Sequence, residues 1–597
     1  MLKSLNEIQN NKIWKKITDI LLPLVLVCFS LMHVTKGLTV TDTGYNYGNF
    51  LFFDGLDDMW KFSTYLANVT GSIFTKLPYG ETVLGLNIYT GLVKTMVAVL
   101  AYYLCVYVCK MRKSFVFFGG MIALGFSWCP TALLYNYMTY LFFNLAVILI
   151  FCAFKTGKNR YLVFAGLCLG LNFMVRIPNV AETALILAVW YGVFLNKGKI
   201  KDFIFATLYA LLGYVIGVGS VILYISIRYG FTAYVNGIKE LFAMTENATS
   251  YSAFSMVKDS IFVYLTYWKW FACLIVAILG GMVLFSIMKN RFEIIKKVLM
   301  VLGMAFYVLL SYSKGYYTLD YREYSSMLFW GVLFLMVAQG ICAYIVLFTK
   351  KEKEIKVLAF MAAIVILITP LGSNNSLYSP INNLYVVAPF ICSVIGDLLY
   401  GEKRVMIRGK IECSTVPAAI VCGCIVGAVL IQSVLFGANF VFRDGTGGEK
   451  REYEVTNSEI LAKVKTTEEN ALNLQGLNDY LLKKEKENAE VLLYGDVPAL
   501  AFYFSLKPVI SSTWPDLESF SYEKFSKEMD LLIEEATLPM VITNVATKES
   551  FSKVKELENE NTNWEKKIIK LRQFLENNQY KESYSNEAFV VYEIVEE

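Results

Sequence analysis

The sequence predicts a multi-pass α-helical membrane protein with a small α/β domain at its C-terminal end. Of its 597 residues, 56% are hydrophobic and 15% aromatic, and the mean hydropathy is +0.48. Apolar runs recur as far as residue 439, many of them about as long as the roughly 20 residues that a helix needs to cross a bilayer. Residues 1–439 carry 36 Lys and Arg against 20 Asp and Glu, whereas residues 440–597 carry 19 against 30. This change from basic to acidic composition predicts two parts in two compartments.

Thirteen membrane spans are expected from the apolar runs. They cover residues 19–36, 86–109, 114–133, 136–154, 161–176, 179–195, 203–227, 262–288, 297–313, 325–349, 356–371, 383–400 and 414–437. The first run is as long as a signal peptide, but no small-x-small cleavage site follows it, so we expect a retained helix.

The distribution of basic residues over the loops sets the expected orientation. The N-terminal segment and every second loop together carry 25 Lys and Arg, whereas the remaining loops carry nine. Because basic loops stay in the cytoplasm, the N-terminus is expected there. The long first loop (residues 37–85) and the tail (residues 440–597) are then outside, and the compact loops and lack of outer disulfides favour a bacterial plasma membrane.

The tail is predicted to fold as a soluble α/β domain. Val491–Pro498 has the pattern of a buried strand that ends in a turn, and Ala499–Phe504 follows as the start of a helix. Met540–Asn544 and Ala588–Ile594 are two further strand candidates. The charged segment Glu549–Glu576 has a helical pattern.

Several kinds of chemistry are excluded by composition. The chain has one histidine, His33, which excludes histidine-rich metal sites and Ser/His/Asp catalysis. Its twelve cysteines lie between Cys28 and Cys424 without a CxxC pair, mostly inside apolar runs, and are interpreted as small apolar residues. Carboxylates and Lys or Arg must therefore carry any catalysis.

Asp42 is the first candidate, because it stands at the outer boundary just after the first span. An ionised group near hydrocarbon is costly and is by default a sign of function. Asp42 also fits a cap for a helix over Gly44–Phe53, so both interpretations remain open at this point. The nearby Asp54, Asp57 and Asp58 are interpreted as a solvated turn.

Other polar residues fall in the loops on the same side of the membrane. The basic candidates are Arg176, Arg228, Lys314 and Arg322, and the aromatic and amide candidates are Tyr45, Asn46, Tyr135, Asn136, Asn374 and Asn375. Each has a plainer explanation, since Arg and Lys snorkel to headgroups and Tyr belongs to interfacial belts. Their coincidence on the face that also carries the tail favours a shared site.

Four stretches carry a resemblance to a known family. They are Thr41-Asp42-Thr43-Gly44-Tyr45, Tyr135-Asn136-Tyr137-Met138-Thr139, the glycine-spaced run from Gly166 to Arg176-Ile177-Pro178-Asn179, and Val491–Pro498. Together with the span count and the outer tail, they resemble the GT-C superfamily of integral-membrane glycosyltransferases, such as the protein mannosyltransferases and aminoarabinose transferases. Many mannosyltransferase-like members carry Asp-Glu in the first loop where this chain has Asp42-Thr43, and the Trp-Trp-Asp signature of oligosaccharyltransferases is absent.

The resemblance implies a polyprenyl-phosphate-linked sugar as the donor and a lipid, polymer or protein as the acceptor, with no nucleic acid involved. Asp42 would serve as the general base or as a ligand of a divalent metal such as Mg, Mn or Zn. Arg176, Arg228, Lys314 and Arg322 would bind the departing phosphate. Tyr45, Asn46, Tyr135, Asn136, Asn374 and Asn375 would contact the sugar or the acceptor.

Two other functions remain open on the sequence. A transporter or flippase of lipid-linked saccharides more often shows internal duplication and mid-membrane charges. This sequence shows no repeat, and its mid-span charges are Lys94 and Lys269. A non-catalytic membrane assembly protein or sensor would tolerate substitution of Asp42.

Overall fold

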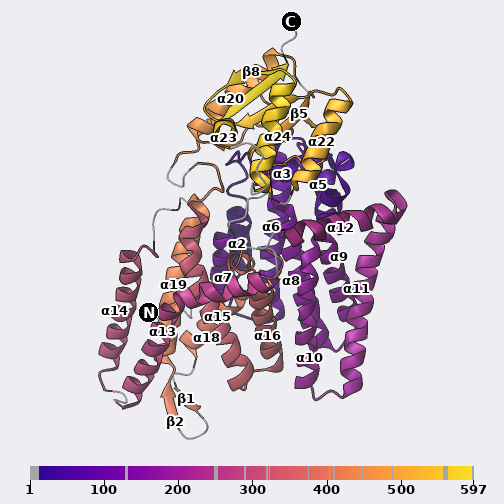
Figure 1. Ribbon diagram of the computed structural model, residues 1–597. Helices are drawn as coiled ribbons and strands as arrows, with labels where there is room; N and C mark the ends of the chain where they lie inside the picture. The colour runs from indigo at the N-terminus through magenta and orange to yellow at the C-terminus, as the bar shows by residue number, and fades with distance from the viewer. Residues whose placement is uncertain are drawn as a thin grey trace.

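The fold consists of a helical bundle capped at one end by an α/β domain, the tail (Figure 1). The structure is a computed structural model. It describes residues 12–127, 132–247, 253–287, 291–317, 321, 323–373, 375–401, 404–407, 411–445, 449–486, 488–518, 520–554 and 562–594.

Each predicted span overlaps a helix among the described residues, although several ends differ, as for the first span (19–36), which overlaps a helix that ends at Ser30. The helices are α2 (Lys12–Ser30), α6 (Val83–Tyr103) with η2 (Leu104–Val108), α7 (Lys113–Phe126), α8 (Leu134–Thr156), α9 (Arg160–Val175), η3 (Ile177–Leu185) with α10 (Ile186–Leu195), α11 (Ile200–Arg228), α13 (Ala253–Ile287), α14 (Glu293–Ser313), η5 (Tyr324–Met327) with α15 (Leu328–Phe348), α16 (Lys353–Ile368), α18 (Val387–Tyr400) and α19 (Val416–Asn439). Among the described residues, eight of these segments are long and apolar enough to cross a membrane. Because α2, α7, α9, α16 and α18 are not among the eight, the number thirteen stays a prediction.

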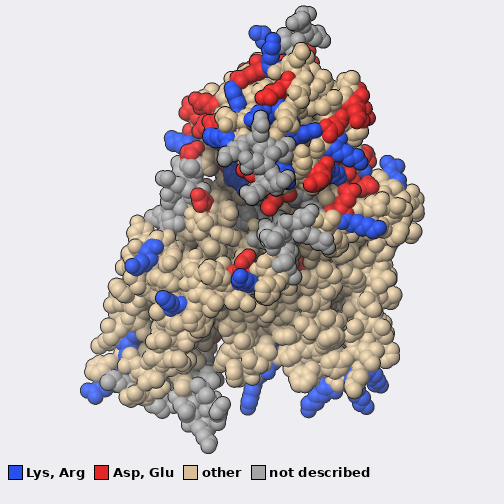
Figure 2. All heavy atoms as spheres, in the orientation of Figure 1, with Lys and Arg blue, Asp and Glu red and all other residues tan. Residues whose placement is uncertain are grey.

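Charge follows the same division along the molecule. On the face drawn in Figure 2, a broad band with few charged side chains separates the charged tail from a lower edge where Lys and Arg gather. An apolar band between two charged ends is what a bilayer requires of a protein that crosses it. The structure therefore supports the prediction of a helical membrane protein, although not the number of its spans.

Glycines bring α9 and α11 into close contact. A Cβ added at Gly166 would lie 1.9 Å from the carbonyl oxygen of Ala210, and one added at Gly213 would lie 1.8 Å from that of Val163. Small residues let membrane helices approach backbone to backbone. This contact fixes α9, whose C-cap residue is Arg176. The glycine-spaced run therefore packs α9 against α11 and so helps to position Arg176 at the end of α9.

The first loop folds into short helices. They are α3 (Asp42–Leu51), η1 (Phe53–Gly55), α4 (Asp58–Ser63) and α5 (Tyr65–Thr75), and α12 (Phe231–Asn247) contacts α4 from the side. Asp57 accepts a hydrogen bond from the backbone N of Met59 at 3.0 Å and so caps α4. Its carboxylate also lies 3.1 Å from Lys524 Nζ of the tail, which in turn lies 3.1 Å from Glu240 of α12. Asp57 is thus part of a contact between three segments rather than only of a solvated turn.

The tail contains a five-stranded sheet. Its elements are β3 (Tyr453–Glu454), β4 (Lys465–Thr466), α20 (Glu468–Lys483), β5 (Glu490–Tyr494), α21 (Ala499–Tyr503), β6 (Lys507–Pro508), α22 (Tyr522–Glu534), β7 (Met540–Asn544), α23 (Val545–Lys553), α24 (Asn563–Asn577), β8 (Tyr580–Ser585) and β9 (Phe589–Ile594). The strand order is β6-β5-β7-β9-β8, with β5 parallel to β6 and β7, and β9 antiparallel to β7 and β8.

The predicted strands β5, β7 and β9 and the helix α21 are confirmed. Strands β6 and β8 were not expected, because β6 has two residues and β8 is a largely exposed edge strand without a buried apolar face. The charged segment Glu549–Glu576 covers the second half of α23 and almost all of α24, and residues 555–561 between them lie outside the described part. The bundle also contains α17 (Tyr378–Asn382) and a hairpin of β1 (Arg404–Ile407) and β2 (Ile411–Ser414) that the sequence did not predict.

The tail and the first loop form one packed unit. The backbone N of Ala499 donates to Val40 O at 2.9 Å, and the Tyr503 hydroxyl donates to Thr39 O at 2.7 Å. The ring of Tyr47 lies 5.3 Å from that of Phe502, inside a hydrophobic cluster that includes residues of both segments. The unit that caps the bundle is therefore built from the first loop and the tail, which lie far apart in the sequence.

Gly44 provides a test of this packing. A Cβ at Gly44 would lie 1.9 Å from Ala499 Cβ, so Gly44→Ala must push α21 away from α3. We expect a loss of about 1–3 kcal/mol, as for other overpacked contacts. The measurements are the apparent melting midpoint of the purified protein and the rate at which a protease releases the tail.

Gly48→Ala is the matched control, because it lies one turn further along α3 and its Cβ would meet Thr513 at an ordinary 3.6 Å. This variant should be neutral or slightly stabilised, since Ala favours helix by about 1 kcal/mol over Gly. Equal behaviour of the two variants would show that the contact between α3 and α21 does not hold the tail.

Candidate functional site

A polar cavity of about 190 Å³ lies between the end of the helical bundle and the unit formed by the first loop and the tail. Its wall is formed by the start of α3, the start of α8, the end of α9 with η3, the loops after α16, and the segment after α19. The charged lining residues are Asp42, Arg176, Glu182 and Arg443, and the polar ones include Tyr135, Asn136, Thr139, Asn179, Tyr324, Thr369, Ser373, Asn375, Ser379 and Asn382.

Asp42 occupies the first turn of α3, where the positive end of the helix dipole favours a carboxylate. The N-cap position is taken by Thr41, one residue earlier than the capping interpretation of Asp42 requires. Burial raises the pKa of the Asp42 carboxyl, and the nearby Arg443 guanidinium acts in the opposite direction. Asp42 Oδ2 lies 3.5 Å from Arg443 Nη1, and 31% of the Asp42 side chain remains exposed. Asp42 is thus a partly accessible carboxylate beside a cation.

Arg176 also lines the cavity, and two contacts hold its side chain in place. Its Nη2 donates to the carbonyl oxygen of Gly372 at 2.7 Å, and its guanidinium lies 5.5 Å from the centre of the Tyr135 ring. Arg176 is in extended conformation where α9 ends, which directs the chain into η3. A guanidinium held in this way lines the cavity, in contrast to the headgroup position that snorkelling predicts.

A second carboxylate, Glu182, is held by a network of amides. Glu182 is buried and accepts a hydrogen bond from Asn172 Nδ2. Asn179 Nδ2 donates to Thr139 Oγ1 at 2.8 Å and to Asn172 O at 3.0 Å. These contacts connect α8, α9 and η3 and give the cavity a rigid polar wall.

The cavity brings five of the predicted residues together. They are Asp42, Tyr135, Asn136, Arg176 and Asn375. Arg322 and Asn374 lie outside the described residues. The common feature of the five is that each stands at a helix end or loop on the side of the tail.

Four predicted residues lie elsewhere. Tyr45 packs between Trp60 and Trp514, with ring centres 5.8 Å apart in both pairs. Asn46 is buried, and its amide donates to the backbone oxygen of Asp42 at 2.8 Å. Arg228 and Lys314 are exposed, at the end of α11 and just after α14. None of the four lines the cavity, so none is assigned a role below.

Glu182, Asn179 and Arg443 line the cavity but are not among the predicted site residues, and Arg443 is the additional cation. Arg443 falls in the predicted tail because it follows the last predicted span, whereas the predicted cations lie in loops between spans. The signal that could have found it is its position, since Arg443 follows the last span much as Asp42 follows the first. The next residue, Asp444, is buried and fixes the backbone on which Arg443 stands.

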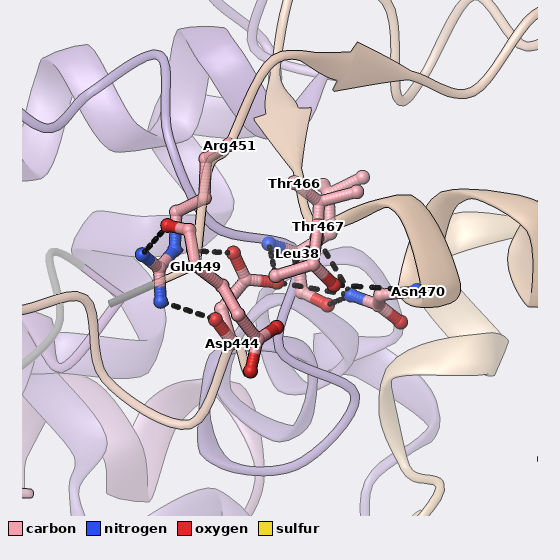
Figure 3. A network of polar contacts seen from close by, with 7 residues as sticks. All are labelled: Leu38, Asp444, Glu449, Arg451, Thr466, Thr467 and Asn470. Atoms are coloured by element: carbon pink, nitrogen blue, oxygen red, sulfur yellow. Dashed lines mark hydrogen bonds and ion pairs between the residues drawn. The ribbon is translucent and has the colours of Figure 1, made fainter. Parts of the chain in front are cut away.

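Asp444 is a buried hub between the two ends of the chain (Figure 3). Its Oδ1 accepts from the backbone N of Leu38 at 3.3 Å, from Asn470 Nδ2 at 3.0 Å and from the Thr466 hydroxyl. Its Oδ2 lies 3.0 Å from Arg451 Nε, and both side chains are almost fully buried. The hub therefore fixes the backbone next to Arg443 against the first loop and the tail.

The residues present do not form a metal site built by the protein alone. Within the described ranges, no group of three or more His, Cys, Asp or Glu side chains is placed to hold a metal ion. Asp42 lies beside Arg443 and Glu182 bonds to Asn172, so the two carboxylates of the cavity already have protein partners. The mechanism below is therefore derived from the side chains.

Comparison with known proteins finds no match, either among models of protein families or among curated sequences.

Proposed function

We propose that the protein is a membrane glycosyltransferase that moves a sugar from a polyprenyl-phosphate-linked donor to an acceptor on the extracytoplasmic face. The observation that carries this proposal is the cavity at the end of the bundle next to the tail. It places an accessible carboxylate, a fixed guanidinium and several amides and hydroxyls around one small volume. These are the groups that transfer from a lipid phosphate requires.

Asp42 is the proposed general base. It takes the proton of the acceptor hydroxyl while the acceptor oxygen forms a bond to the sugar C1. The bond between C1 and the phosphate oxygen breaks, and its electron pair stays on the polyprenyl phosphate. A pKa raised by burial suits this role, because a more basic carboxylate accepts the proton more readily.

Arg176 is the proposed phosphate-binding residue. Arg presents several N–H donors in a plane that matches phosphate oxygens, and a site shielded from water strengthens this contact. The hydrogen bond to Gly372 O and the contact with the Tyr135 ring fix the guanidinium before the donor arrives. Little reorganisation of the side chain is then needed when the phosphate binds. Asn136 and Asn375 line the cavity and are the proposed contacts of the sugar hydroxyls.

The proposed orientation in the membrane follows from charge. Figure 2 has Lys and Arg at the edge of the bundle away from the tail, and this edge is the proposed cytoplasmic side. Under the positive-inside rule the cavity then faces outward. Nucleotide sugars are confined to the cytoplasm, so an outward site in a bacterial plasma membrane fits a lipid-linked donor.

The test compares polyprenyl-phosphate lipids and cell-surface glycans in the wild-type and a deletion strain. The deletion should accumulate one polyprenyl-phosphate monosaccharide and lose one sugar from a surface polymer, and complementation should reverse both. Unchanged lipids and glycans would refute the proposal. Accumulation of the donor on the cytoplasmic leaflet alone would instead indicate a flippase.

The proposal also predicts the pH dependence of transfer. The base must be ionised, so the rate should fall as the pH drops through the pKa of Asp42, and this fall should lie above the range of an ordinary Asp carboxyl. The charged groups facing Asp42 are Arg443, which lowers its pKa, and Asp496 of the tail, which raises it. Asp496→Asn should therefore shift the acid limb of the pH–rate profile to lower pH. A shift to higher pH would contradict the assignment.

A further inference from the structure

The segment that joins α19 to the tail, residues 440–445, is anchored at both of its ends. At its start, the Phe440 ring stacks on Phe436 of α19 with centres 4.6 Å apart. At its end, Asp444 is bound in the buried hub described above (Figure 3). Phe442 and Arg443 between these anchors line the cavity.

Arg443 combines a fixed backbone with a loosely held side chain. Its φ is +45°, a left-handed conformation that costs a non-glycine residue free energy and persists where neighbouring contacts impose it. Its side chain is 53% exposed, and its guanidinium lies 3.5 Å from Asp42 Oδ2 and 5.4 Å from the centre of the Phe442 ring. The guanidinium of Arg443 therefore lies in the cavity and can move there from one anionic partner to another.

We propose that Arg443 is a second phosphate-binding residue, and that its guanidinium passes from the Asp42 carboxylate to the phosphate of the lipid as the sugar is transferred. This inference rests on the proposed function. It adds Arg443, from the segment 440–445, to the residues proposed to bind the donor phosphate.

The charge changes of the reaction favour this exchange. Asp42 carries one negative charge before transfer and none after it has taken the proton of the acceptor hydroxyl. The phosphate carries one negative charge as a diester and gains a second when the bond to C1 breaks and the electron pair stays on its oxygen. One negative charge thus disappears beside Arg443 as another appears on the leaving group, and a mobile cation stabilises both states.

The exchange requires Asp42 and the phosphate to compete for one guanidinium. The test measures binding of undecaprenyl phosphate, and of uncharged undecaprenol for comparison, to the full-length protein in nanodiscs. Arg443→Gln should weaken binding of the phosphate about tenfold or more, since it removes charge-assisted hydrogen bonds, and leave undecaprenol unchanged. Arg443→Lys should keep part of the affinity.

Asp42→Asn should tighten binding of undecaprenyl phosphate about three- to fivefold, because it releases Arg443 from a partly exposed ion pair. The double variant Asp42→Asn with Arg443→Gln should lose this gain, an outcome that a purely structural role of Arg443 does not produce. Lys548→Gln is the matched control, since Lys548 is an exposed cation paired with Glu582 far along the tail. It should bind as the wild type does.

The outcomes separate this inference from the proposed function. If the wild type binds undecaprenyl phosphate and Arg443→Gln binds it equally well, the exchange is wrong and the transferase proposal stands. The exchange is also wrong if Asp42→Asn leaves the affinity unchanged. If the wild type does not bind the lipid phosphate at all and the deletion strain has normal lipids, the proposed function itself is wrong.

Discussion

Replacing Asp42 by Asn is expected to reduce sugar transfer by about 10²–10⁴-fold, the usual contribution of a positioned general base. Asn keeps the shape of the side chain and cannot take a proton from the acceptor hydroxyl. Because Asp42 is the residue after the N-cap of α3 and lines the cavity, the fold should be retained. The measurement is the rate of transfer in membranes that contain equal amounts of each variant, together with the accumulated polyprenyl-phosphate sugar.

Asp54→Asn is the control for this experiment. Asp54 belongs to the same loop, but its side chain is exposed and does not line the cavity. This variant should transfer at the wild-type rate. If Asp42→Asn also retains the wild-type rate, Asp42 is not the base, and the remaining interpretations are transport or assembly.

Replacing Asp444 by Ala is expected to have the largest effect on stability, about 3–5 kcal/mol, as for other buried ion pairs that lose one partner. The change removes the carboxylate that Arg451 pairs with, and also the acceptor for Leu38 N, Thr466 and Asn470. We expect faster proteolytic release of the tail and a lower apparent melting midpoint. Transfer should fall as well, because the backbone next to Arg443 loses its anchor.

Asp530→Ala is the matched control for Asp444. Asp530 also pairs with a cation, Lys570, but its side chain is 52% exposed. An exposed ion pair contributes about 0–1 kcal/mol, so tail release should change little. Similar behaviour of the two variants would show that the hub around Asp444 is not what attaches the tail to the first loop.

The sequence predicted much of the candidate site because of where polar residues stand relative to apolar runs. Asp42, Tyr135, Asn136, Arg176 and Asn375 all lie beside span ends, and alternation of the spans puts these ends on one face. The same reasoning selected Arg228 and Lys314, which share that position in the sequence but end helices that do not border the cavity. Position along the chain gives the depth of a residue but not its place around the bundle.

Tyr45 and Asn46 illustrate a second limit. Both follow Asp42 in the sequence, yet successive residues of a helix point in directions about 100° apart, so neighbours of a site residue turn away from the site. In α3 Tyr45 meets Trp60 and Trp514, and Gly44 meets Ala499. The short motif around Asp42 therefore serves mainly to attach the tail.

By itself, the sequence determined the helical architecture of the bundle and the three central strands of the sheet in the tail. Hydropathy and strand patterns are local properties, because the bilayer length and the alternation of a strand act on consecutive residues. Only the tertiary structure decided that Arg443 reaches Asp42 and that Asp444 joins Leu38 to Asn470. The contacts of Arg443 with Asp42 and of Asp444 with Leu38 join residues about 400 positions apart in the chain, and they depend on helix packing that no local pattern specifies.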